Sequence, residues 1–390
     1  MSEHRTEHAA LDPRPPRDGW SLLWRASPLA LAPQRLLIAF FAAIALMVVG
    51  SVFDSIAGDV PDLGHGVFAT LSGSLIRGVG ATAQGLVRLD LARASNGFAE
   101  GMIYAPIALV RLAPWRCVLL LAVLLPVWTL FGGAISRSVV MDAARGHAVS
   151  VPESIAYALS RSAALLGSYL LPLGLIAMCA GLLWVFGAVL LTLPGVDIAG
   201  GVLYGVALLV GLALSLLSLG LAVGFPLLIP AVAADSADIT DAFQRAYAYL
   251  IERPFSLLVW AVALIAQGAA GVFITAIVVT TAVNWSADLT GAAEAGLAGD
   301  ARLFAPLPEH DGLEGTAGVA AGAIGVWERA AVALIGAHAL SFFFAASSLV
   351  YLRVRRACDG QAIEDVWPRI TAVESVRRGD MEAIADTHDA

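Results

Sequence analysis

The chain has 390 residues, of which 59% are hydrophobic and only 14% are charged, and its mean hydropathy is +0.81. A soluble domain is about 45–50% apolar and about 25% charged, so this composition excludes an ordinary water-soluble protein. The net charge is -8. We therefore expect no nucleic-acid partner, because nucleic-acid-binding surfaces carry clustered basic residues. All 23 basic residues are arginine, a usage that indicates a GC-rich bacterial genome.

Six apolar stretches are long enough to cross a bilayer. A hydrocarbon core of about 30 Å requires about 20 helical residues at a rise of about 1.5 Å each. The first stretch is longer than the apolar region of a cleaved signal peptide, so we expect an uncleaved anchor. The sequence therefore predicts an all-α, polytopic transmembrane helical bundle with interfacial helices and about six spans, near residues 36–56, 117–135, 163–193, 201–232, 255–283 and 326–352.

The distribution of arginine predicts the orientation. If the N-terminus lies in the cytoplasm, sixteen of the 23 arginines fall on the cytoplasmic side and seven outside. Cytoplasmic loops carry the excess of basic residues in membrane proteins. We therefore expect two cytoplasmic tails, a flexible N-terminal one of residues 1–35 and a C-terminal one of residues 353–390, around a transmembrane domain of residues 36–352. The bacterial composition indicates the inner membrane.

The outer loop of residues 57–116 is semi-apolar. Its apolar residues recur every four positions from Val67 to Val79, which places them on one helical face. Residues 101–113 are also apolar, but they are too few to span a bilayer and contain Pro106. We expect amphipathic helices on the membrane surface or over the bundle. A re-entrant hairpin at residues 101–113 is the alternative.

Two connections on the predicted cytoplasmic side resemble each other. One has Ser150 before Pro152 and Glu153, and the other has Asp238 or Thr240 at the same place. Ser, Asp and Thr cap helix N-termini, and proline is favoured in the first turn. The pattern predicts an elbow helix at the inner interface in each connection, although an ordinary loop helix would also fit. Nearby arginines are predicted to anchor this interface, namely Arg137, Arg161, Arg245, Arg253, Arg353, Arg355 and Arg356.

The second elbow and the end of the last span carry a family resemblance. The elbow reads PLLIPAVAADSADITDAFQRAYAYLIERP between two spans, and the last span ends in SSLVYLRVRRACDGQAIEDV. Both segments resemble uncharacterised bacterial multi-span membrane proteins, including the membrane domain that accompanies some glycerophosphodiester phosphodiesterases. The resemblance covers about residues 115–365 and implies architecture. A catalytic barrel of about 250 residues has no room here, so the resemblance implies no catalytic residues.

Two polar residues lie near the middle of predicted spans, Gln267 in the fifth and His338 in the sixth. Polar side chains are costly inside a bilayer and are functional candidates there. Because these spans are consecutive and antiparallel, we expect the two side chains at similar depth and within hydrogen-bonding reach. Such a contact stabilises helix packing by about 0.6–2 kcal/mol. The functional alternative is a proton or substrate site built on a titratable histidine.

The sequence predicts no catalytic residue, metal site or cofactor, and we therefore expect a protein that is not an enzyme. The residues from His4 to His8 match the H-x-x-E-H pattern of zinc proteases, but they lie at the terminus without a third ligand. The three cysteines are far apart and show no metal-binding spacing, at Cys117, Cys179 and Cys358.

Two functions remain after this search. The first is a non-enzymatic membrane protein that organises the envelope or assembles partner proteins. The alternative is a transporter of small molecules or lipids, because helices broken by proline often line transport sites. Four prolines lie in or at the ends of spans, at Pro126, Pro172, Pro226 and Pro230. The expected partners are the lipid bilayer and other membrane proteins, and the sequence leaves the oligomeric state open.

Overall fold

The computed structural model describes residues 20–61, 64–147, 149–192, 195–298, 301 and 315–367. Among these residues the only strand-like pairing is an isolated bridge between Val60 and His65. The prediction of an all-α fold is therefore confirmed. The helices are α1 (Trp20–Trp24), α2 (Ala26–Ala30), α3 (Pro33–Ala57), α4 (Val67–Val87), α5 (Leu91–Ala99), η1 (Glu100–Tyr104), α6 (Ala105–Leu112), α7 (Pro114–Arg145), α8 (Val151–Ser160), α9 (Ser162–Phe186), η2 (Gly187–Leu191), α10 (Asp197–Asp235), α11 (Ile239–Glu252), α12 (Pro254–Leu289) and α13 (Gly315–Asp359).

Six helices are long and apolar enough to cross a membrane, and they match the six predicted spans in order. They are α3, α7, α9 with η2, α10, α12 and α13. The chain is therefore a multi-pass membrane protein. Two helices are much longer than predicted, because hydropathy detects only their apolar centres. Helix α7 continues to Arg145, and α13 covers Gly315–Asp359 where residues 326–352 were expected.

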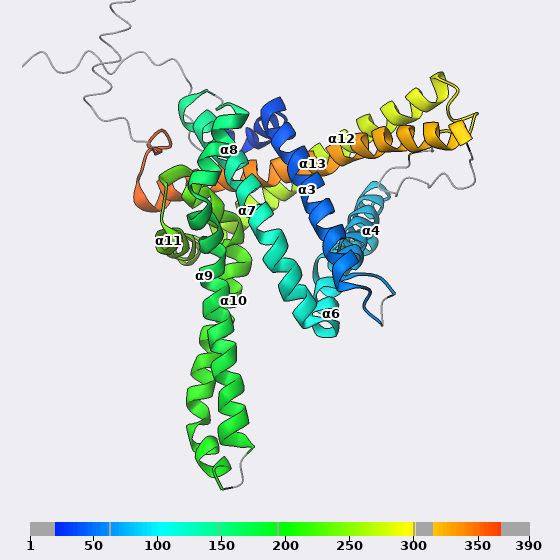
Figure 1. The fold of residues 1–390 in the computed structure, drawn as a ribbon. Coiled ribbons are helices and arrows are strands. Elements are labelled where there is room, and N and C mark those ends of the chain that lie inside the picture. The colour runs from blue at the N-terminus through cyan, green and yellow to red at the C-terminus, as the bar shows by residue number, and fades with distance from the viewer. Residues whose placement is uncertain are drawn as a thin grey trace, which may run out of the picture.

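One end of every span lies in a common core, here called the hub (Figure 1). The hub contains the N-terminal ends of α3, α9 and α12 and the C-terminal ends of α7, α10 and α13, so the chain alternates in direction. Within it, α10 is buried without interruption from Leu227 to Ala234. The Trp128 ring lies 5.4 Å from that of Phe343 and 4.9 Å from that of Phe344, between centroids. Apolar packing therefore fixes the hub ends of the spans.

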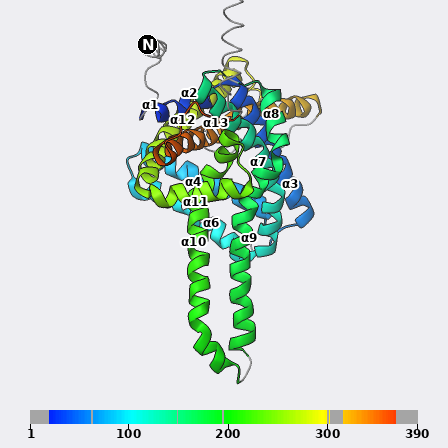
Figure 2. The ribbon, with the colours of Figure 1, turned by 90° about the vertical axis from the view of Figure 1, so that its left-hand side faces the viewer.

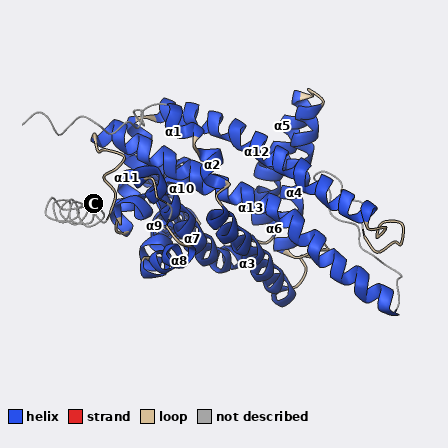
Figure 3. Ribbon diagram, turned by 90° about the horizontal axis from the view of Figure 1, so that it is seen from above, coloured by secondary structure: helices blue, strands red, loops and turns tan. Residues whose placement is uncertain are grey.

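Beyond the hub the spans separate into arms that point in different directions (Figures 1 and 2). One arm is the α9–α10 hairpin, and another is the α12–α13 pair, whose helices lie side by side in the view from above (Figure 3). In the most apolar windows of α9 and α10 only 6% and 11% of the residues are buried. These surfaces lack protein cover, so hydrocarbon must solvate them.

The described part of the N-terminal tail differs from the flexible segment that the sequence predicted. Helices α1 and α2 pack against α12 and α13, with Leu22, Leu23 and Ala26 almost fully buried. The Ser341 hydroxyl donates a hydrogen bond of 2.7 Å to the carbonyl of Ala30. This difference is explained by the leucines between Trp20 and Trp24, because the hub buries their side chains. Residues 1–19 lie outside the described part.

The C-terminal boundary also differs from the predicted one. Residues 353–359 belong to α13, and the segment of residues 361–367 packs onto the hub through Ile363 and Val366, each 1% exposed. The predicted cytoplasmic tail therefore begins with a structured segment. Residues 368–390 lie outside the described part.

The loop between the first two spans forms the predicted helices. Helices α4 to α6, with η1, gather beside the ends of α3 and α7 that lie away from the hub (Figure 1). A Cβ atom at Gly85 would lie 2.4 Å from the backbone nitrogen of Ala94, and one at Gly78 would lie 2.7 Å from the Cα of Gly101. These glycines allow α4 to approach α5 and η1 closely. Residues 105–112 form α6, and their depth in the bilayer stays a prediction.

Both predicted elbow helices are present as α8 and α11. Their N-cap residues are Ser150 and Asp238, as the capping pattern indicated. Neither side chain makes a capping hydrogen bond. The two backbone carbonyls instead accept the first helical bonds, from Ser154 and Ala242, each at 2.9 Å. The pattern therefore predicted the positions correctly and the side-chain bonds wrongly.

Tight packing at Gly132 gives a test of the hub. A Cβ atom at this position of α7 would lie 2.4 Å from Cζ of Phe344, which is itself buried. We expect Gly132→Ala to destabilise the protein by about 1–3 kcal/mol through overpacking. The measurement is the unfolding of detergent-solubilised protein by SDS, followed by circular dichroism.

The matched control is Gly181→Ala in α9, where a Cβ atom would meet nothing within 4 Å. This exposed change should not destabilise the protein, and it should stabilise it by up to about 1 kcal/mol because alanine has the higher helix propensity. Equal effects of the two substitutions would contradict the placement of Gly132 in a filled core.

Candidate functional site

Asp235, the last residue of α10, is the centre of a polar network in the hub. Its carboxylate forms an ion pair with Arg355 of α13 and accepts a hydrogen bond of 2.9 Å from Arg245 of α11. The hydroxyl of Tyr351 donates a third bond, of 2.5 Å. The side chains of Asp235 and Arg355 are 5% and 0% exposed. One carboxylate therefore joins a span, an elbow helix and the last span.

The final carbonyls of α10 are bound by groups from three other segments. Helix ends leave carbonyls without intrahelical partners, and cations are favourable beside them. The Tyr157 hydroxyl of α8 donates to Val232 at 2.7 Å, and Arg137 of α7 donates to Ala233 at 2.9 Å. The backbone nitrogen of Trp367 donates to Ala234 at 2.8 Å. The C-terminus of α10 is therefore fastened from several directions.

Aromatic rings cover this end of α10. The Arg137 guanidinium lies 4.5 Å from the ring centroid of Tyr157 and 5.7 Å from that of Trp367. The guanidinium of Arg161 also lies near the ring of Trp367, 5.6 Å from its centroid. Such cation–π contacts strengthen where water is excluded. Trp367 thus connects the C-terminal segment to the first elbow.

A second polar contact fixes α3 to α7. Arg35, which is fully buried, donates to Asp142 at 2.6 Å and to the hydroxyl of Ser138 at 3.0 Å. It also donates to the carbonyl of Leu29, at 2.7 Å. Arg35 is the last residue of the segment predicted as a flexible tail, so this role was not predicted. The sequence does contain one signal for this contact. The helix of the second span continues past its apolar centre and includes the acidic residue Asp142.

The seven predicted arginine anchors do not form one interfacial set. Arg137 and Arg355, predicted as interface anchors, are buried and donate to protein groups. Buried guanidinium groups need several acceptors, and the end of α10 supplies these. Arg245 is half-buried against Asp235. Of the others, Arg161 and Arg353 are half-buried, whereas Arg253 and Arg356 are exposed.

Arg353 lies beside two tryptophans on the hub side. Its guanidinium is 4.6 Å from the ring centroid of Trp260 and 5.9 Å from that of Trp20. Arg253, on the neighbouring elbow, donates to the carbonyl of Ala357 at 3.3 Å. These two side chains therefore contact the protein while remaining near its surface, as residues at a membrane interface commonly do.

The predicted polar pair is not brought together. Gln267 donates to the carbonyl of Trp24 at 3.0 Å and to the hydroxyl of Ser27 at 2.9 Å. His338 is 1% exposed, and its Nδ1 is hydrogen-bonded to the hydroxyl of Thr275 at 2.6 Å. The direct bond expected between Gln267 and His338 is therefore wrong.

The register of the two helices explains the separation. His338 faces Thr275 and Gly271, a turn or two along α12 from Gln267. The register could not be read from hydropathy. The segment that binds Gln267 was itself assigned to the tail, so its true partners, Trp24 and Ser27, were also missed.

Two tyrosines of the elbows are kept neutral by their surroundings. Burial raises the pKa of Tyr157 above its usual value. The pKa of Tyr249 is raised by burial and also by its hydrogen bond to Asp359. Both phenols therefore act as hydrogen-bond donors at neutral pH, because desolvation opposes the charged phenolate. The network is suited to holding helices together and offers no activated nucleophile in these groups.

No family model matches the chain, and no curated protein or solved structure matches it. In the described part of the chain, no group of three or more His, Cys, Asp or Glu side chains is arranged to hold a metal ion. The interpretation of the hub therefore depends on its own geometry.

The Asp235 network predicts a large and specific loss of stability. Removing one partner of a buried ion pair leaves the other charge uncompensated, at a cost of about 3–5 kcal/mol. We therefore expect Asp235→Asn to lower the free energy of unfolding by this amount. The measurement is SDS unfolding of the purified protein, and the control is Asp241→Asn, an exposed residue in the first turn of α11.

The control loses only a favourable charge near a helix N-terminus, worth about 1 kcal/mol or less. A double-mutant cycle of Asp235→Asn with Arg355→Gln should show strong coupling between the two sites. The account of the hub fails if Asp235→Asn costs no more than Asp241→Asn, or if the two changes in the cycle are simply additive.

Proposed function

We propose that this protein is a non-enzymatic membrane scaffold that organises the envelope or assembles partner proteins. The observation that carries the proposal is the contrast between the hub and the arms. In the hub the ends of six spans are fixed by buried polar and apolar contacts. Beyond it, long apolar surfaces are left for lipid or for other membrane proteins.

The arms present residues suited to contacts inside a bilayer. Leu209 on α10 is 68% exposed and Val319 on α13 is 76% exposed. Helix α13 has 45 residues, about 68 Å at 1.5 Å per residue. This exceeds the roughly 30 Å hydrocarbon core twofold, so part of the helix lies beyond the hydrocarbon or is strongly tilted. A fixed hub with protruding arms can therefore contact several partner proteins at once.

A transporter remains the second candidate, and two observations weigh against it. His338 is buried between α12 and α13 and bonded to Thr275. A described cavity, between α9 and α10, is lined by other residues and does not include this histidine. Prolines that can kink a helix occur inside α7, α9 and α10, but Pro230, at the hub end of α10, is buried.

The proposed location is a bacterial inner membrane with the hub on the cytoplasmic side. The excess of arginine near the hub supports this orientation. The described N-terminal and C-terminal segments also lie at the hub and thus on one side of the spans (Figure 1). The resemblance to elbow-containing bacterial membrane proteins is part of the same proposal, and α8 and α11 are compatible with it.

His338 distinguishes the two candidates. As a packing residue, His338→Ala should lower the free energy of unfolding by about 0.6–2 kcal/mol, and Thr275→Val should have a similar, non-additive effect. Neither change should alter proton flux, measured with a pH-sensitive dye in proteoliposomes. A change in flux with His338→Ala, but not with Thr275→Val, would favour a proton-coupled transporter.

Crosslinking in native membranes tests the scaffold directly. A photoreactive amino acid at Leu209 or Val319 should give adducts with other membrane proteins, because both side chains face outward. The same amino acid at Leu349, which is fully buried in the hub, serves as the matched control and should react only within the chain. Absence of protein adducts at both arm positions, in correctly folded protein, would contradict the scaffold proposal.

A further inference from the structure

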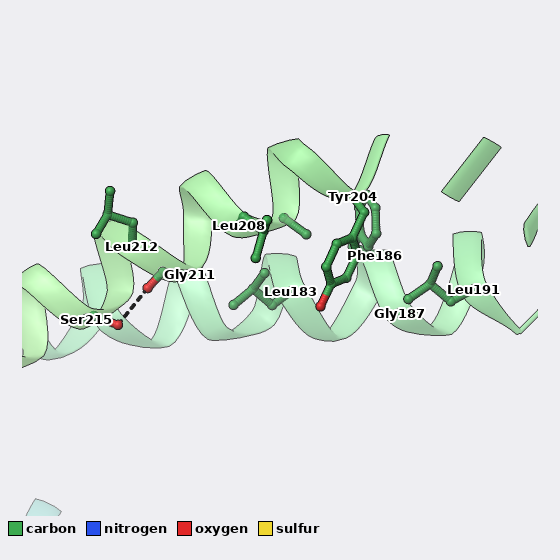
Figure 4. A pocket seen from close by; sticks show the side chains of 10 residues that line it. Leu183, Phe186, Gly187, Leu191, Tyr204, Leu208, Gly211, Leu212 and Ser215 are labelled. Atoms are coloured by element: carbon green, nitrogen blue, oxygen red, sulfur yellow. Dashed lines mark hydrogen bonds between the residues drawn. The ribbon is translucent and has the colours of Figure 1, made fainter. Parts of the chain in front are cut away.

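The α9–α10 arm contains a cavity of about 540 Å³. It lies between the two helices in the part that stands away from the hub (Figure 4). Small-molecule sites have volumes of about 300–1,000 Å³, so this space is large enough for a ligand. The lining residues are Leu183, Phe186, Gly187, Leu191, Tyr204, Ala207, Leu208, Gly211, Leu212 and Ser215.

Two glycines of the lining face open space, as other glycines of this arm do. A Cβ atom at Gly187 or Gly211 would meet nothing within 4 Å, whereas one at Gly132 in the hub would clash with Phe344. Glycine in a span normally lets helices approach each other closely, but here neither glycine has the opposite helix against it. Gly187 also begins η2, a π-helical segment, and such segments are frequent at functional sites.

Most of the side chains in the lining are apolar, and Tyr204 and Ser215 carry its two hydroxyl groups. The hydroxyl of Ser215 is already used, because it donates to the carbonyl of Gly211 at 2.9 Å. The Tyr204 ring lies between the helices (Figure 4) and 6.5 Å from the ring of Phe186, between centroids. Tyrosine favours the boundary between hydrocarbon and headgroups. The cavity therefore has one tyrosine hydroxyl within an otherwise mostly apolar lining, with Leu191 lying beyond Tyr204 towards the tip of the arm.

The length of the cavity matches one leaflet. From Tyr204 to Ser215 the helix rises about 16 Å, which is about half of a 30 Å hydrocarbon core. An extended hydrocarbon chain has the required length and narrow width.

We propose that this cavity binds one acyl chain of a membrane lipid from the leaflet at the tip of the arm. The chain lies along Leu208 and Leu212, and the hydroxyl of Tyr204 donates to an ester oxygen of the lipid. The inference requires only that the arm lies in a bilayer and is independent of the scaffold function. It assigns the α9–α10 arm a bound lipid in addition to the bulk lipid around it.

The test uses vesicles of phosphatidylcholine that carries a photoreactive diazirine in one acyl chain, with the full-length protein reconstituted into them. Leu208 and Leu209 form a matched pair, because they are neighbours on α10 and are 61% and 68% exposed. Only Leu208 lines the cavity. After illumination, mass spectrometry of peptides should find several-fold more lipid on the cavity residues than on Leu209.

Filling the cavity should abolish this preference. Leu208→Trp is expected to remove the excess labelling of Leu212, whereas Leu209→Trp should leave it unchanged. Gly211→Leu provides a second way to fill the space, in case Leu208→Trp disturbs the hairpin, and Tyr204→Phe should reduce the labelling without filling it.

The proposal is overturned if the two faces of α10 are labelled equally, which would indicate bulk lipid only. It is also overturned if the preference survives both filling substitutions in protein that keeps its helical circular dichroism. A photoreactive amino acid at Leu208 that gave an adduct between two copies of the chain, and none with lipid, would assign the cavity to a protein contact and overturn the proposal as well.

Discussion

The carboxylate of Asp235 determines how the rest of the hub is arranged. It lies where α10 ends, and it binds Arg355, Arg245 and Tyr351 from two other helices. A single buried carboxylate would be strongly destabilising in this environment, so its partners must be held in place around it. The elbow α11 and the final turns of α13 are therefore positioned by the charge at the end of one span.

Other polar contacts of the hub also fix the ends of helices. The last carbonyls of α10 bind Arg137, Tyr157 and the backbone of Trp367. Arg35 and Asp142 repeat the arrangement between α3 and α7. Polar contacts therefore define which helix ends meet, and the apolar core around Trp128 provides most of the buried surface. Outside the hub no comparable network is needed, because lipid solvates the arms.

Features set by local sequence could be predicted. The spans follow from long apolar runs, and the elbows follow from capping residues such as Ser150 and Asp238. The helices of the loop after α3 follow from the spacing of apolar residues that begins at Val67. Each of these signals lies within about 20 residues, which is the range over which helical periodicity acts.

Features set by distant pairs could not be predicted. Arg35 and Asp142 are 107 residues apart, and Asp235 and Arg355 are 120 apart. Counting arginines predicts an orientation but cannot tell a buried Arg355 from an exposed Arg356. Gln267 shows the same limit, because its partners Trp24 and Ser27 belong to a segment whose hydropathy resembles that of a tail.

The spans are fixed together at the hub and diverge beyond it. The most direct measurement is electron paramagnetic resonance of spin-label pairs in lipid nanodiscs, after the three native cysteines are replaced. One pair, Arg161→Cys with Arg253→Cys, reports on the hub elbows. The other, Ile198→Cys with Leu289→Cys, reports on the ends of the α9–α10 and α12–α13 arms. The account predicts a narrow, shorter distance for the hub pair and a clearly longer one for the arm pair. Equal, short distances for both pairs would show a compact parallel bundle and contradict the account.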